Sequence, residues 1–202
     1  MRNAYSTFER NLNSVKTLHA IHAHFIQIYT ALDLSEILRA EYVLTVSAFD
    51  CYLHDLVQSR MHAITFELDN NLPSEYAKFK IPIGTLKLFL AASGDDQKQI
   101  LHAALKKSLS EFSFESPQTV ERALGYIGVN KVWTRISVIL QKTPEEIRKQ
   151  LSLIIFRRNC IAHQADIANY TDETKQPIDR DDVSDVIAFI EALVNSINQL
   201  IQ

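Results

Sequence analysis

The densest group of chemically active side chains lies in one stretch, FRRNCIAHQAD at residues 156–166. It places Arg157 and Arg158 directly before Asn159, and His163 follows four residues later. An arginine can hold two oxygens of a phosphate and keeps its charge, whereas an imidazole gives and takes protons near neutral pH. These groups suffice to split an RNA phosphodiester by attack of the 2′-hydroxyl. One takes the 2′ proton, one protonates the leaving 5′ oxygen, and a cation stabilises the phosphorane.

The same stretch also has a purely structural interpretation. Cations near the C-terminus of a helix are favoured by the helix dipole, so two arginines there can form a solvated helix end. The helix expected to carry them begins at Thr143-Pro144-Glu145-Glu146, where Thr caps the helix and Glu stands three residues later. The stretch alone therefore leaves a catalytic site and a helix end as alternatives.

The spacing leaves open which arginine acts. If the helix continues through Ala162, Asn159 is nearly in line with His163, and Arg158 lies about 140° away around the helix. Arg157 lies about 120° away on the other side. Helical geometry alone therefore does not choose between the two arginines.

Asp50 is a second candidate because it interrupts an apolar stripe. The stripe has steps of three and four residues and consists of Val43, Val46, Asp50, Leu53 and Val57. An unpaired carboxylate costs several kcal/mol when buried, so it needs a donor or a cation. Asp50 therefore either faces a solvated seam or holds a basic or polar group from another helix.

The histidines His19, His22 and His24 could suggest a metal site, because the first two share a helical face. No carboxylate or thiolate lies close to them in the sequence, and they flank an apolar stripe. A location at an interface or at the boundary of the core explains them better, and we predict no metal ligands and no cofactor.

Composition excludes several classes of protein. Four Gly and five Pro among 202 residues leave few tight turns, which argues against sandwiches, barrels and Gly-rich phosphate loops. A net charge of −3 excludes a broadly basic coat for nucleic acid, although not a local basic site. The start of the chain lacks a signal pattern, no window is apolar enough to span a membrane, and Cys51 and Cys160 are far apart. We therefore expect a cytoplasmic protein with reduced thiols and no membrane partner.

Apolar periodicity predicts an all-α, single-domain helical bundle over residues 1–202, with long N-terminal helices. The expected helices are 5–32, 36–68, 85–92, 96–111, 118–127, 130–140, one from 144 through the arginines, and one from 181 to the end. Residues 164–179 are polar and aperiodic, which predicts a loop.

Arg158-Asn159-x-x-x-His163, in the setting IIFRRNCIAHQAD, resembles the Arg-x(4–6)-His motif of HEPN domains, in which a polar residue follows the Arg. Asp50, in VSAFDCYLHDL, resembles the acidic position in the long helix of that family. The order of elements from about residue 35 to 202 is most similar to the RiboL-PSP-HEPN subgroup, with a Trp-bearing helix and a Pro-Glu-Glu helix that runs into the motif.

The resemblance implies a HEPN-like bundle that pairs as a two-fold homodimer, with the two motifs facing each other across a cleft. Members of the family cut RNA without a metal and act in toxin–antitoxin systems, phage defence and RNA processing, and some are catalytically inactive. The polar position of the motif selects Arg158 as the catalytic arginine.

We therefore predict a metal-independent endoribonuclease, a toxin or phage-defence effector, with RNA as substrate and an antitoxin or other regulatory protein as a further partner. Arg158 would hold the scissile phosphate, His163 would transfer protons, and Asn159 would orient the RNA. Asp50 would tether Arg158 or Asn159, and Arg157 would contact the RNA backbone in a salt-sensitive way. The alternative is a non-catalytic, dimeric HEPN-type module that binds a partner protein or a nucleotide.

Overall fold

Most of the computed structural model is helical, and it describes residues 3–29, 31–66, 72–110, 114, 116–169 and 171–201. In chain order the elements are α1 (Ala4–Ile28), α2 (Ser35–Phe66), η1 (Tyr76–Lys78), α3 (Ile83–Ala91), α4 (Asp95–Ser110), α5 (Pro117–Tyr126), α6 (Val132–Leu140), α7 (Pro144–Gln164), β1 (Ile167–Asn169), β2 (Thr174–Lys175) and α8 (Arg180–Ile201). The all-α prediction is confirmed. The predicted helix ends at residues 68 and 111 lie outside the described residues. No described helix is long and apolar enough to cross a membrane.

Two helix starts follow the capping signals in the sequence. The Thr143 hydroxyl accepts a hydrogen bond from the backbone N–H of Glu146, and the Glu146 carboxylate accepts one from the backbone N–H of Thr143. Ser116 and Thr119 form the same reciprocal pair at the start of α5. Each box satisfies backbone donors that the first helical turn leaves without partners.

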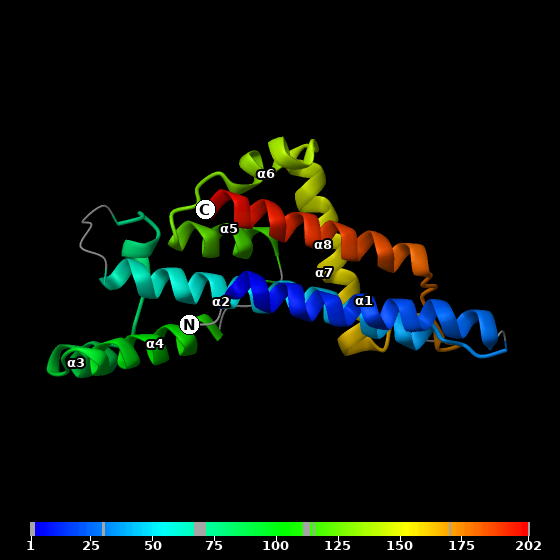
Figure 1. Cartoon of the computed structure of the whole chain (residues 1–202), viewed down its shortest axis with the longest axis horizontal. Helices are drawn as coiled ribbons and strands as arrows, with labels where there is room; N and C mark the ends of the chain where they lie inside the picture. The colour runs from blue at the N-terminus through cyan, green and yellow to red at the C-terminus, as the bar shows by residue number, and fades with distance from the viewer. Residues whose placement is uncertain are drawn as a thin grey trace.

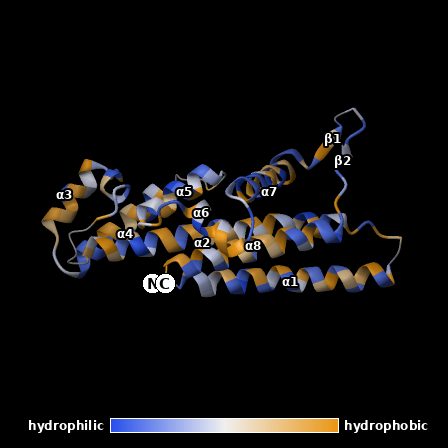
Figure 2. Cartoon of the chain, turned by 90° about the horizontal axis from the view of Figure 1, so that it is seen from above, coloured by the Kyte–Doolittle hydropathy of each residue, from blue (hydrophilic) through white to orange (hydrophobic). Residues whose placement is uncertain are grey.

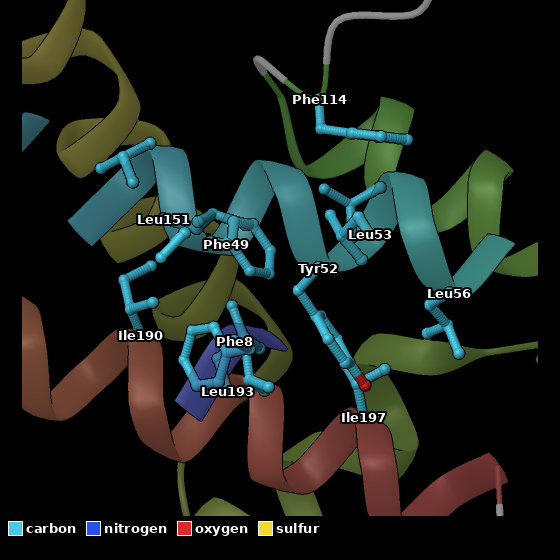
Figure 3. Close-up of a cluster of buried hydrophobic side chains, with 14 of the residues drawn as sticks. Phe8, Phe49, Tyr52, Leu53, Leu56, Phe114, Leu151, Ile190, Leu193 and Ile197 are labelled. Carbon is cyan, nitrogen blue, oxygen red and sulfur yellow. The ribbon is translucent and has the colours of Figure 1, made fainter. Parts of the chain in front are cut away.

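α2 is the central helix of the bundle. α1 lies along it on one side, α8 on another, and α7 crosses it (Figure 1). Buried side chains from all four helices meet in one cluster (Figure 3), of which the labelled members include Phe8, Phe49, Tyr52, Leu151 and Ile190. The rings of Phe8 and Tyr52 lie 5.8 Å apart across the α1–α2 contact. This packing holds α7, the helix with the Arg-Asn-His motif, against a rigid support.

The second half of α1 differs from the sequence prediction. Phe8, Leu12 and Val15 are buried, as the apolar stripe predicts, but Phe25 and Ile28 further along the same stripe are exposed. α1 extends beyond the N-terminal end of α8 (Figures 1 and 2), so its last turns have fewer neighbours to cover them.

The predicted loop after α7 contains a short hairpin. β1 and β2 pair antiparallel, with Ile167 opposite Lys175. The Asp172 carboxylate accepts hydrogen bonds from the backbone N–H and the hydroxyl of Thr174, which closes the turn between the strands. A hairpin closed by local side-chain hydrogen bonds needs no apolar periodicity in its sequence. This explains why the pattern of residues 164–179 indicated only a loop.

Two of the N-terminal histidines, His19 and His22, join a buried cluster between α1, α2 and α8. The fully buried Glu41 carboxylate lies 2.7 Å from Nδ1 of His19, whose Nε2 lies 2.9 Å from the Ser184 hydroxyl. His22 is buried beside them, whereas His24 is exposed. No carboxylate lies near these histidines in the sequence, and the structure supplies that of Glu41 from α2. Even so, the described residues contain no group of three or more His, Cys, Asp or Glu side chains that could hold a metal ion.

His22 generates a prediction about pH. Burial lowers the pKa of His22, as do the nearby charges of His19 and Arg180, while Glu41 acts in the opposite direction. Below about pH 6.5 the unfolded imidazole takes up a proton that the folded one resists. The free energy of unfolding should therefore fall as pH drops from 7 to 5, by at most about 1.4 kcal/mol per pH unit for this group.

His22→Gln should flatten this dependence in denaturant titrations at each pH, because the titrating group is gone. His24→Gln is the matched control on the exposed side of the same helix and should keep the slope of the wild type. Equal slopes in all three proteins would contradict this account of His22.

Candidate functional site

The motif helix ends in a sharp turn directly after His163. α7 runs without a break to Gln164, and the next two residues, Ala165 and Asp166, have left-handed φ values of 51° and 62°. This conformation is unfavourable for residues with a Cβ atom. The backbone N–H of Asp166 donates to the carbonyl of Cys160 at 3.0 Å, which ties the turn to the helix. The turn brings Asp166 back beside α7.

Asp166 is the buried anchor of this region. Its side chain is fully buried, and its Oδ2 atom accepts hydrogen bonds from Nε of Arg39 at 2.8 Å and from Nη2 of Arg157 at 2.9 Å. Arg39 also donates to the carbonyl of Gln176 at 2.7 Å. A buried carboxylate is tolerated because it is paired and hydrogen-bonded. The three charged groups therefore join α2, the end of α7 and the segment after β2.

Arg157 is committed to this network. Besides Asp166, its guanidinium donates to the side chain and carbonyl of Gln176 and to the carbonyl of Pro177. The side chain is 19% exposed. Its role in the described chain is therefore structural, and the predicted contact of Arg157 with RNA stays a prediction.

The environment of Arg158 differs from that of Arg157, whose guanidinium is hydrogen-bonded within the chain. Among the buried polar atoms of the described chain that have no hydrogen-bond partner are Nε of Arg158 and Oδ1 of its neighbour Asn159. Arg158 also follows the helical spacing of Ile147, Leu151 and Ile154, which are buried, so it lies on the inward side of α7. Unsatisfied buried donors and acceptors are costly and rare. Two of these atoms lie on adjacent residues of the motif.

His163 lies on the exposed side of the same helix. Because α7 is continuous, Asn159 and His163 are one turn apart on one face, and Phe156 precedes them on that face. Phe156 is 66% exposed, and Leu153, one turn before it, is 58% exposed. We call Leu153, Phe156, Asn159 and His163 the motif face. It combines a proton-transfer group with an apolar surface that nothing in the described chain covers.

Asp50 lies partly in solvent. Its carboxylate is 3.6 Å from Nε2 of His54 on the next turn of α2, and its side chain is 36% exposed. This contact with His54 does not test the predicted tether from Asp50 to Arg158 or Asn159. The predicted tether from Asp50 to the motif therefore stays a prediction, and Asp50 itself lies beside His54.

Arg39 was missed by sequence reasoning, although a signal was present. It occupies an inward position of α2, in register with the buried Tyr42 and Val46, just as Asp50 interrupts its own stripe. Burial raises the pKa of Tyr42 to about 12 although the Arg157 charge acts to lower it, so this neighbouring phenol is not an acid or a base near neutral pH.

Comparison with known proteins gives one match. A family model described as RiboL-PSP-HEPN matches residues 9–202. No curated protein and no solved structure matches the chain.

The different environments of the two arginines predict different effects on stability. Arg157→Ala should lower the free energy of unfolding by about 2–3 kcal/mol, because charged hydrogen bonds to a buried carboxylate are lost while Arg39 stays. Asp166→Ala should cost about 3–5 kcal/mol, because it leaves two cations without their anion.

Arg158→Ala is the matched control and should change the free energy of unfolding by less than about 1 kcal/mol, because it breaks no hydrogen bond at Nε. Urea titrations followed by circular dichroism measure all three variants. A larger loss for Arg158→Ala than for Arg157→Ala would overturn the assignment of Arg157 to the structural network.

Proposed function

The chain belongs to the RiboL-PSP-HEPN family, and on that premise we propose that it is a metal-independent endoribonuclease that acts as a homodimer. Its biological role would be that of a toxin or phage-defence effector, held in check by an antitoxin or other regulatory protein. Arg158, Asn159 and His163 would act on the RNA, and Asp50 would help to position them. The proposal rests on the motif of α7 and on the unsatisfied polar atoms within it.

One observation carries the proposal: two adjacent motif residues have buried polar atoms without partners. Nε of Arg158 is a donor, and Oδ1 of Asn159 is an acceptor. A bound RNA backbone offers acceptors for the first in its phosphate oxygens and a donor for the second in its 2′-hydroxyl. Both atoms are buried, so the two side chains would turn toward the RNA, and binding would then remove an existing energetic penalty as well as form new contacts.

The chemistry is a displacement within the RNA. A base takes the proton of the 2′-hydroxyl, whose oxygen attacks the adjacent phosphorus while the bond from phosphorus to the 5′ oxygen breaks. An acid then protonates that leaving oxygen, which gives a 2′,3′-cyclic phosphate and a 5′-hydroxyl. His163 supplies proton transfer, and Arg158 stabilises the extra negative charge of the phosphorane.

A dimer would supply both the base and the acid that the reaction needs. One chain offers a single histidine in the motif, whereas the reaction needs a base and an acid at once. Leu153 and Phe156 provide an exposed apolar surface beside Asn159 and His163. A two-fold contact across this surface would place a second motif near the first. The second His163 would then act as the partner acid or base.

The alternative function, a non-catalytic dimeric module, is favoured by the net charge of −3, which gives weak general affinity for RNA. The motif argues against it, because Arg158, Asn159 and His163 are all present. A purified wild-type dimer that binds a partner protein but leaves RNA intact would support this alternative.

The nuclease proposal predicts the products of cleavage. Purified wild-type protein should cut RNA in the presence of EDTA, and the fragments should end in 2′,3′-cyclic phosphate or 3′-phosphate, as judged by end-labelling and mass spectrometry. His163→Ala should leave the RNA uncut and should abolish any growth defect that wild-type expression causes. Loss of cleavage with EDTA, or fragments with 3′-hydroxyl ends, would contradict the mechanism.

The kinetic prediction separates the two arginines. Arg158→Ala should lower kcat at saturating RNA by about 100-fold or more, because a group that stabilises the transition-state charge is lost. Arg157→Ala should keep most of kcat when assayed well below its melting temperature, since its guanidinium is bound to Asp166. If Arg157→Ala abolishes turnover while Arg158→Ala preserves it, the catalytic assignment is wrong by one residue.

The dimer prediction tests the motif face. Wild-type protein should scatter light as a species of twice 23.1 kDa at micromolar concentration. Phe156→Asp should give the 23.1 kDa monomer, because it places a charge in the apolar contact. Ile83→Asp, which changes an exposed apolar residue on the distant α3, should stay dimeric. A monomeric wild type, or a dimeric Phe156→Asp variant, would rule out this contact.

A further inference from the structure

The helix α3 is unusually apolar for an exposed element. It lies at one extremity of the molecule, far from the C-terminal end of α7 in both views (Figures 1 and 2), and Figure 2 shows it as largely hydrophobic. None of its residues is buried, and Ile83, Leu88 and Leu90 are among the most exposed large apolar side chains of the described chain. Such exposure needs an explanation, because monomers rarely display contiguous apolar patches.

A cavity of about 400 Å³ lies between α2, α3, α4 and the segment before α3. Its walls are formed mainly by aliphatic and aromatic side chains, among them Met61, Leu86, Phe89, Leu101 and Leu105. The hydroxyls of Thr65 and Tyr76, which also line it, hydrogen-bond to each other. These polar atoms thereby satisfy one another, and the cavity presents an apolar interior.

A second, wider hollow of about 960 Å³ adjoins this cavity, because Phe79, Ile81 and Thr85 line both. Its rim carries Lys78, Lys80 and Lys107, all of them exposed. Lys78 is paired with Glu75 at 2.6 Å, whereas the ion pairs of the described residues include none for Lys80 or Lys107. Because they share these three residues, the two hollows form one groove with a narrower apolar part and a wider part lined by the three lysines, and we call this wider part the mouth.

The segment that forms most of this groove has a net charge opposite in sign to that of the whole chain. Residues 76–110 contain six lysines and two aspartates, a net charge of +4 in a chain whose total is −3. A concentration of positive charge on an otherwise acidic protein attracts an anion to this place. The apolar interior and the basic mouth therefore select the same kind of molecule.

We propose that this groove binds an amphiphile that has an aliphatic chain and an anionic head group. The chain occupies the apolar cavity between α2, α3 and α4, and the carboxylate or phosphate head lies at Lys80 and Lys107. The cavity volume falls in the range of small-molecule sites. The site is separate from the motif on α7, so its existence does not depend on the nuclease proposal.

Titration calorimetry with sodium dodecanoate, below the concentration at which it forms micelles, tests the proposal. Each methylene buried in an apolar site raises affinity about fourfold, so decanoate should bind about fifteenfold more weakly than dodecanoate. Thr85→Trp should weaken dodecanoate binding at least tenfold, because it fills the junction of the two hollows. A melting curve checks that this variant folds.

Charge-reversing substitutions of exposed lysines test the role of the positive charge at the mouth of the groove, because replacing exposed residues leaves the fold intact. Lys80→Glu and Lys107→Glu should each weaken binding by about three- to tenfold, and less at high salt. Lys149→Glu makes the same change of charge on the exposed side of α7 and should bind dodecanoate like the wild type.

Vesicles distinguish the two sources of such an amphiphile. If the natural ligand is a bilayer lipid, the protein should sediment with vesicles of phosphatidylglycerol and phosphatidylcholine but not with phosphatidylcholine alone. The double variant Ile83→Asp/Leu90→Asp should abolish that binding while keeping dodecanoate binding. If the ligand is a soluble amphiphile, only dodecanoate should bind. Binding to neither probe, or binding that Thr85→Trp and both lysine variants leave unchanged, would overturn the proposal.

Discussion

The carboxylate of Asp166 holds together the part of the molecule that carries the proposed site. It is fully buried and accepts hydrogen bonds from Arg39 on α2 and Arg157 on α7. Without this pairing its charge could not stay inside the protein. The pairing fixes the turn after His163 and joins α7 to α2, so the position of the motif depends on an interaction outside the motif itself.

This arrangement gives two adjacent arginines different environments. Arg157 turns toward Asp166 and Gln176, where its donors are used within the chain. Arg158 points along the inward side of α7 with Nε buried and without a partner, and Asn159 beside it has a buried acceptor in the same condition. The proposed function assigns these two side chains to the RNA, because the described chain offers the two atoms no partner.

Signals within short stretches of the sequence predicted most of the fold, whereas they did not predict which side chains pair across distant elements. Capping boxes at Thr143 and Ser116 and the 3.6-residue period gave helix starts and faces, because those signals act within one turn. Asp166 pairs with Arg39, 127 residues away in the sequence, and His19 contacts Glu41, 22 residues away. Arg39 and Glu41 interrupt apolar stripes as Asp50 does, but spacing does not reveal which partner a buried charge will find. The motif was found through its resemblance to a family.

The most direct test of this division of roles is the nuclear magnetic resonance spectrum of the arginine guanidinium N–H groups. It would be recorded before and after addition of a 2′-O-methyl RNA oligonucleotide, which lacks the attacking hydroxyl and is not cut. The account predicts that the Arg158 signals shift and their exchange with water slows, while those of Arg157, already protected by Asp166, stay unchanged. Shifts confined to Arg157, with Arg158 unaffected, would contradict it.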